Sequence, residues 1–166
     1  MIKKLLLLAA VVLPLFASAQ TMKIGLVNTT DIFAQMPDTK EAENTLKALN
    51  DKYQAEVQSL LTEIQKLEDE LKALPEDTPK AIQESRYNNY MEKRQKLETF
   101  AQQAEQDVNK KQQELMQPIM QKISQAIEAV GKEGNFSLIQ ELQGSLYYGA
   151  PVQDITPQVK AKLNLK

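Results

Sequence analysis

The amino-acid sequence predicts a mainly α-helical protein in which a long antiparallel helical hairpin is inserted into a small body of strands and short helices. Three observations indicate this fold class. A seven-residue apolar repeat fills the middle of the chain, two prolines interrupt it halfway, and short apolar runs typical of strands occur near the two ends. The expected domains are a signal peptide at 1–19, a body formed by 20–38 and 116–166, and an arm at 39–115 with its tip at 75–79.

The N-terminus has the pattern of a secretory signal peptide. A basic pair at 3–4 precedes an apolar stretch at 5–16, which is too short to span a bilayer, and the Ala-Ser-Ala sequence at 17–19 is the pattern that a signal peptidase recognises. Cleavage after Ala19 would make Gln20 the first mature residue. The alternative is an uncleaved membrane anchor, but the short length of the stretch and the cleavage site both favour cleavage and export.

The composition excludes several classes of function. The chain has 20 basic and 22 acidic residues, whereas a general nucleic-acid binder carries a basic excess. Histidine and cysteine are both absent, which removes the most common general base, the most common metal ligand and the usual thiol nucleophile. With five glycines, the chain has no Gly-rich phosphate loop. The sequence therefore predicts a protein that is not an enzyme and that has no metal or other cofactor.

The first part of the body should contain a strand and a short helix. Residues 23–28 (KIGLVN) form an apolar run rich in Ile, Leu and Val, as strands do. One of the two threonines at 29–30 can cap the helix that follows, and Phe33 would lie on its buried face. Pro37 should end this helix, and one of the polar residues at 38–39 should cap the next one.

The outgoing leg of the arm carries an apolar heptad repeat. From Tyr53 onward its apolar residues are spaced alternately four and three residues apart, and Asn50 is a polar seam position that would fix the register. The seam of this leg consists of Leu46, Tyr53, Val57, Leu60, Ile64, Leu67, Leu71 and Leu74. Such a narrow stripe is typical of a coiled-coil helix, whereas a helix packed on a globular core has a wider one.

A proline-rich turn and a second leg follow. Residues 75–79 contain two prolines with polar residues between them, which a regular helix cannot accommodate. The heptad period then resumes with a smaller and more polar seam. This seam consists of Tyr87, Tyr90, Arg94, Leu97, Ala101, Ala104, Val108, Lys111 and Leu115. Because the legs 39–74 and 80–115 are equally long, we expect an antiparallel hairpin of about 54 Å, at a rise of about 1.5 Å per residue.

The second part of the body should begin where the hairpin ends. Pro118 should kink or restart the helix, and the wider apolar face beyond it suits a helix packed on a body. Two strands are expected at 136–140 (FSLIQ) and 145–148 (SLYY), joined by a turn near 142–144. A last short helix should begin near Pro157. A body this small is marginal as a monomer and has strand edges to cover, so self-association is expected.

In this order, the segments resemble the Skp/OmpH family of periplasmic chaperones. The resemblance rests on the signal peptide, the KIGLVN run with Asp31-Ile32-Phe33 behind it, the charged heptad hairpin, and the closing series AIEAVGKEGNFSLIQ, SLYYGAPVQDIT and VKAKL. It covers essentially the whole mature chain. It implies a homotrimer in the periplasm, with a central β-barrel built from the strands of three chains and arms that enclose a cavity. It also implies ATP-independent holding of unfolded outer-membrane proteins, with membrane lipid or lipopolysaccharide as a further partner.

Two features of the arm bear on how it would bind such clients. Leu49, Leu61 and Phe100 fall beside the seam, where they could contact a client or could equally widen the packing stripe. The arm is also acidic on balance, with five Lys against eight acidic residues in 40–74 and six basic against seven acidic residues in 75–110. Known members of the family are strongly basic, so charge attraction to clients should contribute less here.

Two further groups of residues are candidates for contacts outside the arm seam. The apolar residues expected to join subunits in the body are Ile24, Leu26, Phe33, Leu138, Ile139 and Leu146. Lys110 and Lys111 fall where the family tends to place a basic pair, which could bind lipid phosphate. The alternative is a solvated helix face on which the stem of Lys111 lies along the seam.

A different function remains open on the sequence alone. A periplasmic structural or adaptor protein could use a coiled-coil hairpin to dock to an envelope assembly. The resemblance of both body segments to the chaperone family argues against this alternative, as does the lack of any other domain around the hairpin.

Overall fold

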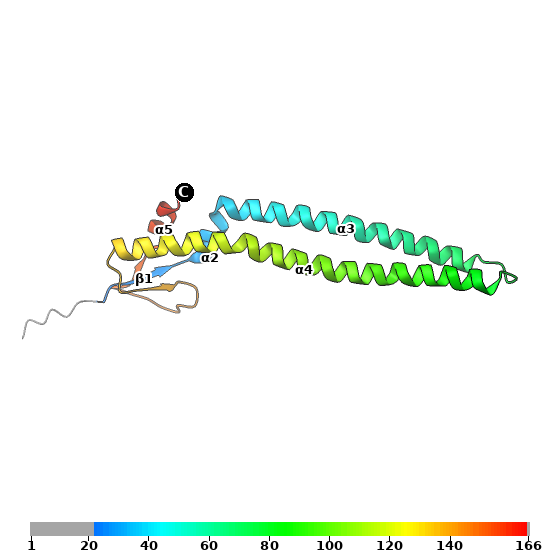
Figure 1. The fold of residues 1–166 in the computed structure, drawn as a ribbon. Helices are drawn as coiled ribbons and strands as arrows, with labels where there is room; N and C mark the ends of the chain where they lie inside the picture. Colours follow the sequence, from blue (N-terminus) through cyan, green and yellow to red (C-terminus); the bar gives the residue numbers. More distant parts are fainter. Residues whose placement is uncertain (1–21, 166) are drawn as a thin grey trace, which may run out of the picture.

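The computed structural model describes residues 22–165 of the protein. A small body lies at one end, and a long helical hairpin projects from it (Figure 1). The elements in chain order are β1 (Ile24–Val27), α2 (Thr29–Gln35), α3 (Pro37–Lys72), α4 (Lys80–Glu133), β2 (Leu138–Glu141), β3 (Gln153–Asp154) and α5 (Thr156–Lys162). The prediction of a mainly helical fold with a small sheet is confirmed. The signal peptide expected at 1–19 lies outside the described residues.

The strand and the short helix expected at the start of the body are present, but the cap of the helix differs. The threonine cap predicted at 29–30 is wrong, because Asn28 caps α2: its Oδ1 accepts a hydrogen bond from the backbone N–H of Asp31 at 2.9 Å. Asn is as good an N-cap as Thr, and Asn28 is placed first, directly after β1. Thr29 instead donates through its hydroxyl to Oε2 of Glu141 at 2.6 Å, which joins α2 to the end of β2.

Pro37 ends α2, as expected, but it also begins α3. The cap predicted at Asp38 or Thr39 is wrong, because the N-cap is Met36 and no side chain bonds the start of the helix. A proline in the first turn lacks the N–H that a cap would satisfy, so the need for one is smaller. Thr39 is buried, and its Oγ1 donates to the backbone carbonyl of Phe33 at 2.7 Å. This bond links the end of α2 to the first turn of α3.

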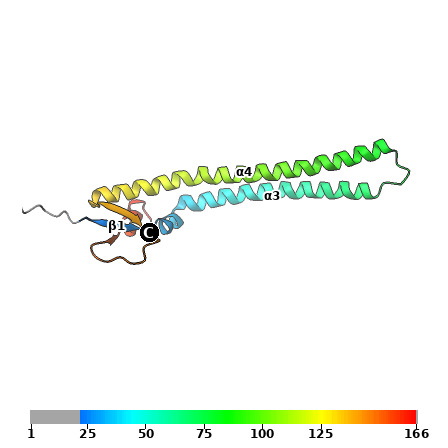
Figure 2. The same ribbon diagram turned by 90° about the horizontal axis from the view of Figure 1, so that it is seen from below.

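The hairpin consists of α3 and most of α4, which lie side by side in both views (Figures 1 and 2). The legs meet at a turn between Lys72 and Lys80, where the sequence predicted the tip. Beyond the base of the arm, where Thr39 and Ala42 are buried, the most buried residues are Leu60, Ile64 and Ala104. The other apolar seam residues of the outgoing leg are half-buried, and so are Leu97, Val108 and Leu115 on the returning leg. Two thin helices cannot bury their seams more fully than this.

Four residues expected on the seam are exposed: Asn50, Tyr87, Arg94 and Ala101. Three of them lie on the returning leg, whose seam is smaller and more polar. Ala101 is too short to fill the space between the two helices, and the polar ends of the other three side chains stay in water. The grooves described below lie along the arm for the same reason.

Helix α4 passes through Pro118 without interruption, so the predicted restart of the helix there is wrong. Proline removes the hydrogen bond to the carbonyl four residues earlier, which belongs to Glu114. Both Pro118 and Glu114 are exposed, so water can satisfy that carbonyl. The neighbouring Ile119 and Ile123 are buried in the body and hold the helix in place on the opposite side.

The body contains a three-stranded sheet in the order β2-β1-β3, and both strand pairs are parallel. Ile24 pairs with Leu138, and Leu26 pairs with Asp154, so β1 lies at the centre. The strand predicted at 136–140 is confirmed as β2, shifted toward the C-terminus.

The second C-terminal strand predicted at 145–148 is absent. The chain turns after β2, where the N–H of Ser145 donates to the carbonyl of Leu142 at 3.1 Å and Gly144 adopts a φ of 104°. It then crosses to the far side of β1 and forms β3 instead. The SLYY segment therefore makes no ladder with β2 and stays exposed.

The core of the body lies between the sheet, α2, α5 and the last part of α4. Its buried residues are Val27, Ile32, Met36, Ala42, Ile119, Ile123, Ala126, Val130, Ile155 and Val159. Because Ala42 belongs to α3 and the partly buried Leu115 also packs here, the core extends into the base of both legs. The predicted last helix is confirmed as α5, with Pro157 in its first turn.

Candidate functional site

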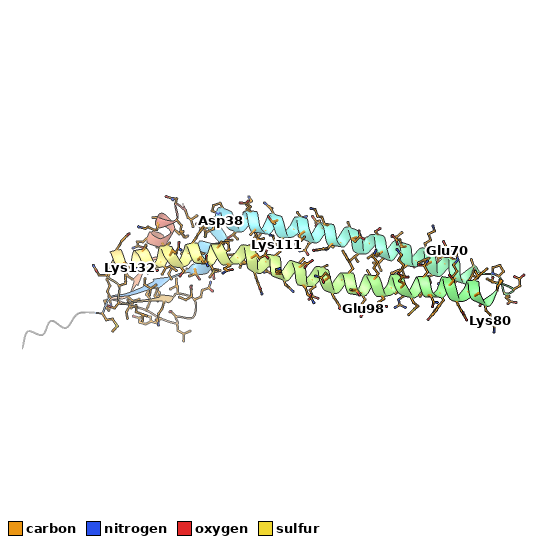
Figure 3. All side chains as sticks on the ribbon, in the orientation of Figure 1. Asp38, Glu70, Lys80, Glu98, Lys111 and Lys132 are labelled. Atoms are coloured by element: carbon orange, nitrogen blue, oxygen red, sulfur yellow. The ribbon has the colours of Figure 1, made fainter. Side chains whose placement is uncertain are left out.

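Charged side chains cover the outer surface of the arm along its whole length. Figure 3 shows them from Asp38 at the base, past Lys111 and Glu98, to Glu70 and Lys80 near the tip. Most of the ion pairs of the arm are formed by exposed side chains, which contribute little to stability individually. The charges therefore keep the arm in water, and the apolar gaps between them are the places where another molecule could bind.

Three polar contacts join the two legs of the hairpin. The hydroxyl of Tyr53 donates to Oδ2 of Asp107 at 3.0 Å, and this hydrogen bond raises the pKa of Tyr53. Nearer the tip, Nζ of Lys93 lies 2.6 Å from Oε2 of Glu63; their hydrogen bond lowers the pKa of Glu63 and raises that of Lys93. A third contact joins Arg86 and Glu70 at 3.3 Å. These contacts fix how the legs align beyond the body.

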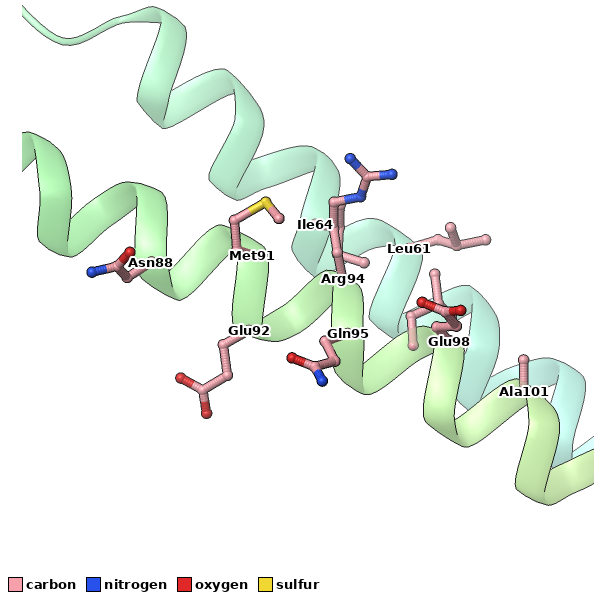
Figure 4. Close-up of a pocket in the computed structure, with 10 residues that line it drawn as sticks. Leu61, Ile64, Asn88, Met91, Glu92, Arg94, Gln95, Glu98 and Ala101 are labelled. Atoms are coloured by element: carbon pink, nitrogen blue, oxygen red, sulfur yellow. The ribbon is translucent and has the colours of Figure 1, made fainter.

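A groove lies between the legs in the outer half of the arm (Figure 4). It encloses about 890 Å³ and is open to solvent along its length. Leu61 and Ile64 of α3 line one side, and Met91, Leu97 and Ala101 of α4 line the other. We call this region the distal groove.

The distal groove combines an apolar floor with a charged rim. Leu61 and Met91 are each 43% exposed, so a large part of both apolar side chains already faces water. Glu92, Arg94 and Glu98 also line the groove and have polar or charged ends. A partner that places apolar side chains on this floor would remove them from water, which is favourable at about 25 cal/mol per Å² of apolar surface.

The three residues predicted beside the seam prove to have different surroundings. Leu61 is exposed and lines the distal groove, whereas Leu49 is half-buried. Phe100 is also half-buried, because its ring packs edge-on against Tyr53 with centroids 5.8 Å apart. The structure thus leaves Leu61 as the best placed of the three to contact another molecule, and it gives Phe100 a packing role.

The basic pair predicted near the base of the arm lies on the helix surface. Lys110 is exposed, and Lys111 is half-buried with its Nζ 3.4 Å from Oε2 of Glu114. The neighbouring Glu114 reduces the positive potential that a phosphate would meet at this pair.

The six body residues predicted to join subunits are divided between core and surface. Leu26 is buried, Phe33 and Ile139 pack against the core, and Ile24 is half-buried. Leu138 is exposed on β2, and Leu146 is 103% exposed within the SLYY segment. In the single chain, only these last two offer a large apolar surface to another molecule.

Sequence reasoning missed several exposed apolar residues. Ile82 and Met91 were not singled out, and Tyr87 was assigned to the seam, yet all three are exposed on the outer half of α4. Tyr147 and Tyr148 add to the exposed surface beside Leu146. Helical periodicity alone could not separate them from packed residues, since exposure depends on what the facing leg supplies at each level.

Within residues 22–165, no helix is both long and apolar enough to cross a membrane. The same residues contain no group of three or more acidic side chains close enough to hold a metal ion. The arm grooves and the exposed body surface are therefore the features of the described chain from which a function can be argued.

The stability of the protein should change little between about pH 5 and pH 9 and should decrease on both sides of this range. The hydrogen bond from Lys160 lowers the pKa of Asp31, and that from Lys93 lowers the pKa of Glu63. Their contribution is complete above the unfolded pKa of about 4 and is lost as the pH falls through the lower folded value. Tyr53 behaves oppositely: its raised pKa gives a contribution that is complete below about pH 10 and is lost as the pH rises through the folded pKa.

Thermal unfolding followed by circular dichroism at a series of pH values would measure this profile. Tyr53→Phe keeps the ring that packs on Phe100 but removes the hydroxyl, so it should reduce the loss at alkaline pH and leave the acid side unchanged. With no histidine in the chain, a stability step between pH 6 and 7 would contradict this account.

Comparison with known proteins connects this architecture to a family. The family model described as outer membrane protein (OmpH-like) matches residues 23–163. The chain is 32% identical over 164 residues to the chaperone protein Skp of Yersinia enterocolitica, which covers 95% of this chain and 96% of that protein. It is 30% identical over 163 residues to the chaperone protein Skp of Pectobacterium atrosepticum, with the same coverage. The matches span both body segments and the arm.

A solved structure shows the same fold. A protein from Caulobacter crescentus, described as an OmpH-like outer membrane chaperone, superposes with a TM-score of 0.74 over 86% of this chain and 84% of that one. Its sequence is 16% identical, so this likeness concerns the fold alone. The resemblance inferred from the order of segments in the sequence is confirmed.

Proposed function

The chain belongs to the OmpH-like family of outer membrane proteins, and on this premise we propose that it is a chaperone for unfolded outer-membrane proteins. Its relatives at 32% and 30% identity are named as chaperones. The observation that best supports the proposal is the distal groove, a wide, open, apolar surface on a thin charged arm. A surface of this kind suits a partner with apolar segments and no fixed shape.

Holding is passive in this proposal. The periplasm supplies no ATP, and the sequence contains no nucleotide-binding loop. An unfolded outer-membrane protein exposes apolar strands that pair with one another and aggregate. Contacts with several arms at once would shield those strands, and many weak contacts add up through a high effective concentration. The chaperone would thus delay aggregation without any chemical step.

Self-association belongs to the body in this proposal. Leu138 and Leu146 are exposed together with Tyr147 and Tyr148, a set of large apolar side chains that would otherwise stay in water. Strands β2 and β3 also leave outer edges without a partner strand in the single chain. A homotrimer whose strands close a central barrel, as the family resemblance implies, would cover both features.

The proposed location is the periplasm, reached through a signal peptide that is cleaved after Ala19. The mass of the mature protein from its host would then correspond to a chain that begins at Gln20, and a retained Met1 would contradict cleavage. Lipid or lipopolysaccharide is a weaker candidate partner. Lys110 and Lys111 would be its contact, but the ion pair between Lys111 and Glu114 offsets part of their charge.

A light-scattering assay tests the proposed function. An outer-membrane β-barrel protein is diluted from urea into buffer with increasing amounts of the chaperone, and scattering is followed over time. We expect scattering to be suppressed near one trimer per client, without nucleotide. An adaptor that uses its hairpin to dock to an envelope assembly would leave the aggregation unchanged. That result would reject the holding function.

A further inference from the structure

The arm contains a single sulfur atom. Cysteine is absent from the chain, and Met91 is the only methionine between Met36 and Met116. Thioethers are the most readily oxidised side chains that remain when thiols are absent. Any oxidation of sulfur in the arm must therefore occur at Met91.

Met91 lies where its oxidation state would matter. It lines the distal groove together with Leu61 and Leu97, and its side chain extends from α4 on the side that faces α3 (Figure 4). It is 43% exposed, so a small oxidant in solution can reach its side chain. A flexible, polarisable thioether also adapts well to clients of different shape, which is how methionine serves at other promiscuous binding surfaces.

We propose that Met91 is an oxidation site for hydroperoxides and that its conversion to the sulfoxide weakens client holding by the distal groove. The site itself follows from geometry and sulfur chemistry, while its effect on holding rests on the proposed function. In the reaction, a sulfur lone pair attacks one peroxide oxygen, the O–O bond breaks, and an S–O bond forms. The sulfur is oxidised by two electrons, and the departing oxygen leaves as water when the oxidant is hydrogen peroxide.

The consequence follows from the change in polarity. The sulfoxide is polar and chiral, and a client side chain packed on it must displace the water bound to its oxygen. Burying such a group without a hydrogen-bond partner is unfavourable, so the affinity for an unfolded client should fall by about tenfold. Every arm carries the same residue, so the loss would occur at each arm of an assembly.

The other methionines provide internal references. Met22 and Met120 are exposed, but neither lines the distal groove, and Met36 is 4% exposed within the body core. Peroxide should therefore oxidise Met22, Met91 and Met120 well before Met36. Of the three exposed residues, only Met91 should affect holding.

The experiment treats the full-length protein with hydrogen peroxide and removes the oxidant before any client is added. Peptide mass spectrometry gives the extent of oxidation at each methionine, and circular dichroism checks the helix content. Client affinity is compared before and after treatment in the wild type, in Met91→Leu, and in Met120→Leu as the matched control. Treatment should lower the client affinity about tenfold in the wild type and in Met120→Leu. In Met91→Leu, the client affinity should be nearly the same before and after treatment.

Two further measurements make the test sharper. Met91→Gln places a polar group of similar size in the groove and should bind clients as weakly as the oxidised wild type. Methionine sulfoxide reductases should restore the affinity of the oxidised protein. If Met91 is oxidised no faster than Met36, Met91 is not a preferred oxidation site. If oxidation lowers the helical signal, the loss of binding comes from unfolding and not from the changed polarity of the distal groove.

The two proposals can fail separately. If the protein still holds clients normally when Met91 is fully oxidised, the inference is wrong and the proposed function stands. Failure of the untreated wild type to hold clients would overturn the proposed function, and with it the effect proposed for the sulfoxide.

Discussion

Ile123→Ala should lower the free energy of unfolding of the body by about 2–5 kcal/mol, the range observed for such truncations in well-packed cores. Ile123 is 1% exposed and lies in the core with Ile119, Ile155 and Val159, which come from α4, the segment before α5, and α5 itself. Removing its outer carbon atoms leaves a cavity where elements distant in the sequence meet. A body this small has little stability in reserve.

The matched control is Ile82→Ala in the same helix. Ile82 is 48% exposed near the tip, so its truncation removes few contacts, and alanine is the better helix former. Its effect should stay within about 0.5 kcal/mol. Denaturation in urea, followed by circular dichroism at one fixed protein concentration, would compare the two variants, since self-association also stabilises the folded state. Equal effects of both substitutions would show that the packing of α4 in the body does not determine stability.

The sequence predicted the hairpin well because its signal is periodic and local. The repeat from Tyr53 to Leu74 and the two prolines of the tip each act within one helix or turn, so no knowledge of the rest of the fold is needed. At Pro118, where propensity predicts a kink or a restart, the helix does not restart. There the packing of Ile119 and Ile123 on the body and the exposure of the Glu114 carbonyl outweigh the cost of proline.

The body was harder to predict because its strands depend on partners. The SLYY segment has the composition of a strand and the outer edge of β2 is free, yet the segment forms no ladder in the single chain. Whether an apolar run becomes a strand depends on its pairing with other segments, which the run itself does not encode. In the proposed self-association, the exposed Leu146 and its tyrosine neighbours would pack against another subunit.

The candidate site was predictable as a region but not residue by residue. Leu61 and Phe100 both lie one step beside the seam, and periodicity treats them alike. Tyr53 stands opposite Phe100 and covers its ring, whereas the residues around Leu61 leave it facing an open groove. That difference arises between the two legs, and it becomes visible only when their alignment is known.

Removing the arm should abolish client holding while self-association of the body persists. Deleting residues 44–114 removes the arm. The residues on either side of this deletion lie beside each other at the base of the hairpin, because Ala42 and Leu115 pack against the same core. A short Gly/Ser linker can join them across the distance of about 8–10 Å between packed helices. The variant keeps every buried residue of the body core and loses both legs of the distal groove. It should therefore sediment as the same oligomer as the full chain and should fail to suppress the aggregation of an unfolded outer-membrane protein.

A half-length arm separates the contribution of the distal groove from that of the base. Replacing residues 61–97 with a short Gly/Ser linker joins Leu60 to Glu98, between the level of the Glu63–Lys93 pair and that of the Tyr53–Phe100 contact, so the remaining legs can keep their alignment. This variant retains the contact between Tyr53 and Phe100 but loses the tip and the groove residues Leu61, Ile64, Met91 and Leu97. If the distal groove carries most of the binding, the half arm should hold clients nearly as poorly as the armless variant. Holding close to that of the full chain would place the client contacts at the base of the arm or on the body. If the variant without residues 44–114 sediments as a monomer, the subunit contacts lie in the arms and not in the body.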